Sequence, residues 1–167
     1  MKICLTIYSS PWSEFAGGGQ IAVHHLACAL QRMGHDVHVL YSKSHDEKIT
    51  ATPPYTLHWT THFHCATLNF DIFSFARALK RLMKWERFDI LHGNAEEAFF
   101  ASNIAKNFDA GYVFTSHSCM IPETGIIRGM LRPVTFLKNV NNYLLRSSAY
   151  NASRVITFSE FSRKLVL

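Results

Sequence analysis

The chain has 167 residues, of which 48% are hydrophobic and 17% are charged, a composition that excludes a disordered or fibrous protein and fits one globular domain. Its 17 Lys and Arg outweigh 12 Asp and Glu, for a net charge of +5, which favours anionic partners without selecting among them. No run approaches the roughly 18 apolar residues that a membrane span requires, and the amino-terminal run lacks the cleavage pattern of an export signal.

Apolar strands and amphipathic helices alternate along the chain. The first strand, residues 3–8, ends in a Ser-Ser-Pro loop, and the helix over residues 20–33 stops at Gly34, where a helix C-cap is typical. The clearest helix spans residues 71–87, with apolar residues on one side and basic residues on the other. The remaining expected elements are strands over residues 37–41, 55–59, 88–92, 112–117 and 154–158, helices over residues 96–107 and 133–148, and a last helix capped by Ser159.

This alternation predicts an α/β fold with a Rossmann-like parallel sheet and helices on both faces, because parallel neighbours need crossover connections. In such sheets, ligands bind at the carboxyl ends of the strands. The candidate sites are therefore residues 9–19, 92–97 and 117–123, together with Ser159.

Three glycines, Gly17 to Gly19, lie between the first strand and its helix. N–H groups at a helix start can hold a phosphate or carboxylate, and glycine lets the backbone approach closely. With Ala22 the glycines also fit a dinucleotide pattern, but seven residues separate them from the strand and no acid ends the second strand, which argues against such a site. A plain turn that starts a helix stays open as the alternative.

Two histidines end neighbouring strands of the predicted sheet. His117 can donate to a phosphate or sugar hydroxyl, or shuttle a proton near neutral pH; a local loop contact is the alternative. For His92, ligand contact and structural support of the next strand end are both open. Glu96 and Glu97 open the following helix, where we expect acids to act as caps.

The sequence contains none of the common metal, hydrolase or nucleic-acid motifs. Although ten histidines occur, there is no His-Glu-x-x-His and no cysteine pair at ligand spacing, so we expect no metal ion and no other cofactor. A serine-hydrolase elbow and RNA-binding aromatic motifs are also missing, and we expect no nucleic-acid partner. The four scattered cysteines indicate reduced thiols in a cytoplasmic protein.

The basic side of the helix over residues 71–87 carries Arg77, Lys80, Arg81 and Lys84. A solvated face is the usual interpretation of such a pattern. The alternative is attachment to anionic lipid headgroups, which would make the protein peripheral to the inner face of the membrane.

A second basic region follows the strand over residues 112–117. No Asp or Glu occurs between Thr124 and Ser159, whereas Arg128 and Arg132 fall there. Since this stretch can overhang the carboxyl edge of the sheet, it favours an anionic or lipid-phosphate acceptor.

Several segments together resemble the N-terminal half of a family 4 glycosyltransferase of the GT-B architecture. Each one is short, but their order and spacing are specific, and they extend over nearly the whole chain. They are Gly17 to Gly19 after the first strand, His24 to Leu30, Met33 to Val39, Phe88 to His92, Thr115 to His117, and Ala152 to Glu160.

The resemblance implies transfer of a sugar from a nucleotide-sugar donor to a glycan or lipid-linked acceptor, with retention at the anomeric carbon and no required metal. It places Gly18 and Gly19 against the donor diphosphate and sugar, and has His117 hydrogen-bond the donor sugar and support catalysis. His92 and Ser159 match positions near the acceptor side or the interdomain cleft. Asn94 stands where relatives often carry a second histidine.

The family's second half holds the Lys and Arg that neutralise the leaving diphosphate and the paired glutamates that hold the ribose and sugar. We find no match to that half in this sequence. We therefore expect residues 1–167 to form an acceptor-side domain, inactive without a C-terminal nucleotide-sugar-binding domain, because diphosphate departure depends on those cations. A free-standing binding or partner domain of the same fold is the alternative.

Overall fold

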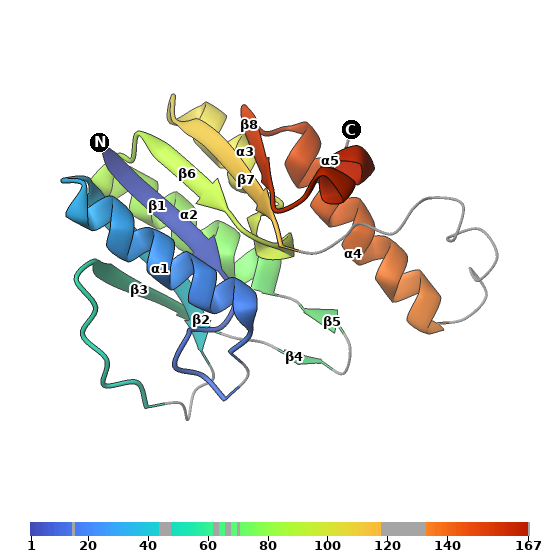
Figure 1. Cartoon of the computed structure of the whole chain (residues 1–167), viewed down its shortest axis with the longest axis horizontal. Coiled ribbons are helices and arrows are strands. Elements are labelled where there is room, and N and C mark those ends of the chain that lie inside the picture. Colours follow the sequence, from blue (N-terminus) through green and yellow to red (C-terminus); the bar gives the residue numbers. More distant parts are fainter. Residues whose placement is uncertain are drawn as a thin grey trace.

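A six-stranded parallel sheet forms the centre of the computed structural model, which describes residues 1–14, 16–43, 48–61, 64–65, 68–69, 71–117 and 133–166 (Figure 1). The strand order is β3-β2-β1-β6-β7-β8, and every neighbouring pair is parallel. This confirms the predicted fold class. The strands are β1 (Lys2–Ile7), β2 (Asp36–Lys43), β3 (Thr56–Thr61), β6 (Ile90–Gly93), β7 (Gly111–Ser116) and β8 (Arg154–Thr157).

Helices cover both faces of the sheet, with α1 in front and α2 and α3 behind (Figure 1). Alternate residues of β1 enter two separate apolar cores, because successive strand side chains point to opposite faces. Leu5 packs in the core under α1, and Cys4 packs in the core formed with the other helices. The helices are α1 (Gly18–Arg32), α2 (Asp71–Glu86), α3 (Ala101–Asn107), α4 (Pro133–Tyr150) and α5 (Glu160–Val166).

Two differences from the sequence-based expectation concern which elements form. The helix expected over residues 96–107 is broken into a 3-10 helix, η1 (Glu96–Ala98), and α3. A short antiparallel pair, β4 (His64–Cys65) and β5 (Leu68–Asn69), was not expected, because two-residue strands show no periodicity. The stretch with Arg128 and Arg132 lies outside the described residues.

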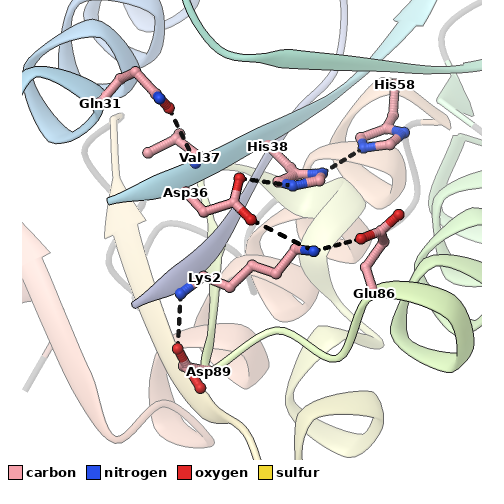
Figure 2. A network of polar contacts seen from close by, with 8 residues as sticks. All are labelled: Lys2, Gln31, Asp36, Val37, His38, His58, Glu86 and Asp89. Carbon is pink, nitrogen blue, oxygen red and sulfur yellow. Dashed lines mark hydrogen bonds and ion pairs between the residues drawn. The ribbon is translucent and has the colours of Figure 1, made fainter. Parts of the chain in front are cut away.

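A chain of polar contacts joins β1, β2, β3 and α2 at the amino-terminal edge of the sheet (Figure 2). The ammonium group of Lys2 pairs with the carboxylates of Glu86 and Asp36, the latter at 3.5 Å. Asp36 Oδ1 lies 3.2 Å from His38 Nε2, and His38 Nδ1 lies 2.8 Å from His58 Nε2. Since His38 donates to the carboxylate through Nε2, its Nδ1 accepts from His58. These contacts brace the edge opposite to the strand ends expected to bind ligands.

Gly93, at the end of β6, is packed too closely for any side chain. A Cβ there would lie 2.3 Å from Ala98 Cβ and 2.9 Å from the Tyr112 hydroxyl oxygen. We expect Gly93→Ala to lower the free energy of unfolding by about 2 kcal/mol, because overpacking forces neighbours apart. Urea denaturation measures this effect. Gly111→Ala is the control, since its Cβ would have no atom closer than 3.7 Å, and equal midpoints for both variants would contradict the packing.

Candidate functional site

The carboxyl ends of β1, β6 and β7 lie side by side where the strand order reverses. The chain first adds β2 and β3 on one side of β1, then returns to place β6, β7 and β8 on the other. Such a switch point leaves a crevice outside the carboxyl ends of the two central strands, which is the usual ligand site of open α/β sheets.

The structure brings Gly19 and His117 together at this switch point, and the sequence had indicated each of them as a candidate site residue. A Cβ on Gly19 would lie 3.5 Å from Cγ and 3.6 Å from Nδ1 of the imidazole. Directly after β8, the ring of Phe158 packs against His117 with centroids 5.2 Å apart. Burial lowers the pKa of His117, so the imidazole is neutral near pH 7.

The glycines themselves form the first turn of α1, two residues before the expected start. Gln20 fixes this turn: its Oε1 accepts the Gly17 N–H at 2.9 Å, and its Nε2 donates to the Tyr8 carbonyl at 3.0 Å. The N–H groups of Gly18 and Gly19 have no acceptor within the helix. A Cβ on Gly18 would meet no atom within 4 Å. The turn therefore offers two N–H donors to an anion.

His92 and Asn94 lie behind His117. His92 is 5% exposed, and its Nε2 is 2.7 Å from the Thr115 hydroxyl oxygen. Burial lowers the pKa of His92 to about 4, with a smaller contribution from His117, so the ring is neutral at physiological pH. This placement favours the structural interpretation of His92, as support for the end of β7, over direct ligand contact.

Glu97 is a site residue whose burial the sequence analysis missed. It stands in the first turn of η1, as expected, but its side chain is 1% exposed and its Oε1 accepts from the Thr6 hydroxyl at 3.1 Å, a contact that the expectation of a helix cap did not include. Within the described part of the chain, Oε2 has no hydrogen-bond partner. Burial, with the nearby charge of Glu96, raises the pKa of Glu97 to about 8. In the sequence Glu97 stands beside Glu96, and no signal there distinguishes the buried acid from its neighbour.

Ser159 caps α5, as predicted: its Oγ accepts the Ser162 N–H at 3.0 Å. Its side chain is exposed and follows β8. Of Phe158 and Ser159, which both follow β8, it is Phe158 whose side chain packs against His117.

The basic residues of α2, namely Arg77, Lys80, Arg81 and Lys84, are all exposed. They lie on the opposite side of the sheet from α1 and so outside the crevice. Two exposed aromatic residues lie on the same surface of the helix, Phe73 at 59% and Trp85 at 80% exposure. Residues 73, 77, 81 and 85 are spaced four apart, and residues at this spacing are neighbours on a helix surface. We call these six side chains the cationic face.

The chain matches the family model described as Glycosyltransferase Family 4 over residues 16–167. The comparison with curated proteins gave no match. Among solved structures, it is similar to sucrose-phosphate synthase from Thermosynechococcus elongatus, with a TM-score of 0.74 and 18% identity over 99% of this chain and 45% of that one.

Two further structures show the range of enzymes that share the fold. A putative UDP-N-acetylglucosamine 2-epimerase from Listeria monocytogenes has a TM-score of 0.63 and 9% identity over 99% of this chain and 41% of that one. The catalytic domain of starch synthase IV from Arabidopsis thaliana, bound to ADP and acarbose, has a TM-score of 0.60 and 16% identity over 92% and 44%. The chain spans less than half the length of each of these three structures.

Proposed function

The chain belongs to Glycosyltransferase Family 4, and from this we propose that it is the acceptor-side domain of a retaining enzyme that moves a sugar from a nucleotide-sugar donor to a glycan or lipid-linked acceptor. The observation that carries the proposal is the closeness of Gly19 to His117 at the switch point. A Cβ added to Gly19 would lie 3.5 Å from the His117 ring. Such a site places donors for an anionic diphosphate directly beside a group that can bond a sugar hydroxyl.

In this proposal Gly18 and Gly19 bind the donor diphosphate through backbone N–H groups, and His117 is the catalytic residue that bonds the donor sugar. His92 acts indirectly, by supporting the end of β7 through its contact with the Thr115 hydroxyl. Ser159, exposed after β8, lies on the side proposed to receive the acceptor. The scheme uses no metal ion and no other cofactor.

We propose that a second domain holds the nucleotide and supplies the cations that neutralise the leaving diphosphate. Three described side chains lie against Gly19 or His117, those of Ile7, Asn94 and Phe158, and none of the three is cationic. Exposed apolar side chains on β8 and α5, such as Ile156 and Phe161, provide a surface for that domain. Because diphosphate departure is mainly an electrostatic problem, the chain alone is proposed to be inactive.

The test is product analysis with the full-length enzyme and a panel of nucleotide sugars. We expect a free nucleoside diphosphate and a glycoside that keeps the anomeric configuration of the donor, as seen by NMR. An inverted glycoside would contradict retention. Epimerised donor without transfer would assign the chain to the epimerase class that shares its fold, and no donor consumption would favour the free-standing binding domain.

A second proposal concerns the cationic face of α2, which we propose attaches to the anionic inner surface of the cytoplasmic membrane. Its four cations can pair with lipid phosphates while exposed Phe73 and Trp85 enter the headgroup region. Among the described residues, no helix combines the length and apolar character needed to cross a bilayer.

Replacing the four basic residues of the cationic face with Gln is expected to weaken co-sedimentation with anionic vesicles about 1,000-fold, since each cation near such a surface contributes about 1 kcal/mol and about 1.4 kcal/mol corresponds to a factor of ten. Trp85→Ala is expected to weaken it further. The matched control neutralises four exposed cations elsewhere, which are Arg32, Lys48, Lys106 and Lys164. An equal loss in the control would show attraction to net charge alone and contradict a dedicated face.

A further inference from the structure

The side chain of Asn94 has only one allowed orientation. It is 2% exposed, and its Nδ2 lies 3.0 Å from the backbone oxygen of Thr6 and 3.2 Å from that of His92. Both partners are carbonyl oxygens, which accept hydrogen bonds and cannot donate them. The amide therefore turns its NH₂ group toward them, because the flipped amide would place its oxygen against two acceptors in a buried site.

This orientation decides which nitrogen of His117 carries the proton. The remaining Asn94 atom, Oδ1, lies 3.0 Å from His117 Nε2. An amide oxygen only accepts, so Nε2 must carry the hydrogen. A neutral imidazole holds one ring proton, which leaves a lone pair on Nδ1.

The unprotonated nitrogen lies on the ligand side of the ring. A Cβ on Gly19 would be 3.6 Å from Nδ1, so this atom borders the glycine turn. We propose that Asn94 is a positioning residue that fixes His117 in its Nε2–H tautomer and thereby presents Nδ1 as a hydrogen-bond acceptor beside Gly19.

The tautomer has a consequence for recognition, which rests on the proposed function. A lone pair at Nδ1 accepts from a sugar hydroxyl and repels a phosphate oxygen, which is itself an acceptor. The neutral His117 therefore selects a hydroxyl of the donor sugar and leaves the diphosphate to the N–H groups of the glycine turn.

Long-range proton–nitrogen NMR of the ¹⁵N-labelled chain near pH 7 tests the tautomer without any substrate. We expect the Nε2 resonance of His117 at the position of a protonated ring nitrogen and the Nδ1 resonance at that of an unprotonated one. A protonated Nδ1 in the wild-type chain would overturn the proposal, whatever the variants show.

Asn94→Ala is expected to remove the preference, so that both His117 nitrogens move toward an averaged position. In the full-length enzyme the same variant is expected to lower kcat/KM about tenfold, the effect of one lost neutral hydrogen bond. The control is Asn103→Ala, an exposed position on α3, which should change neither readout. An unchanged tautomer in Asn94→Ala would overturn the positioning role.

If Asn94→Ala does not fold, Asn94→Ser provides the second variant, because its short polar side chain fits a polar site and no longer carries the amide oxygen that accepts from Nε2. It is expected to lose the preference for the Nε2–H tautomer, and an unchanged tautomer in this variant would contradict the positioning role. A full-length enzyme without transfer activity but with the expected tautomer would refute the proposed function and leave the role of Asn94 intact.

Discussion

His117→Ala is expected to reduce sugar transfer by the full-length enzyme at least 100-fold while the domain stays folded. A positioned histidine at the reacting group typically contributes on the order of 10²–10⁴ to the rate. The cost to folding should be small, because the ring is half-buried and its described contacts are one hydrogen bond to Asn94 and packing against Phe158.

The measurement is kcat/KM together with the thermal unfolding midpoint for the same variant. His25→Ala is the matched control, since His25 is an exposed histidine of α1 and should change neither value. Wild-type turnover by His117→Ala would remove His117 from the catalytic machinery.

Glu97→Gln is expected to raise the free energy of unfolding by about 3 kcal/mol near pH 7. Burial raises the pKa of Glu97 to about 8 in the folded chain. At pH 7 the carboxyl group is therefore mostly protonated in the folded chain and ionised in the unfolded chain, so folding at this pH includes the uptake of a proton. Gln resembles the protonated acid and does not titrate. The stability that Glu97 contributes is complete below its unfolded pKa and is lost as the pH rises through its folded pKa.

The gain from Glu97→Gln should therefore vanish near pH 4 and grow as the pH rises to about 8. Denaturant unfolding of both proteins across this range measures the difference, in which all other titrating groups cancel. Glu14→Gln serves as the control, since Glu14 is exposed. A gain independent of pH would show that Glu97 is ionised in the folded chain.

The overall fold could be predicted because its signals are local. Apolar runs mark the six strands of the main sheet, and the spacing of apolar residues marks α2 to within one residue of its end. The break between η1 and α3 was not predictable in this way. It accompanies the inward turn of Glu97 toward Thr6, a contact between residues 91 positions apart.

The same distinction holds for the candidate site. Gly19 and His117 follow strands in a parallel sheet, so the rule for strand ends identified both. Asn94 and Glu97 act through contacts with Thr6, on a strand that only the folded sheet places beside β6. Helical spacing and motif patterns contain no information about such partners, and this is why Glu97 was expected, like Glu96, to act only as a helix cap.

The central claim is that this chain carries one half of a catalytic centre. It is tested most directly by comparing nucleotide-sugar consumption by residues 1–167 alone and by the full-length enzyme, at equal concentration and with the same acceptor extract. We predict turnover by the full-length enzyme and none above background by the chain alone. Turnover at the same rate by residues 1–167 would contradict the claim.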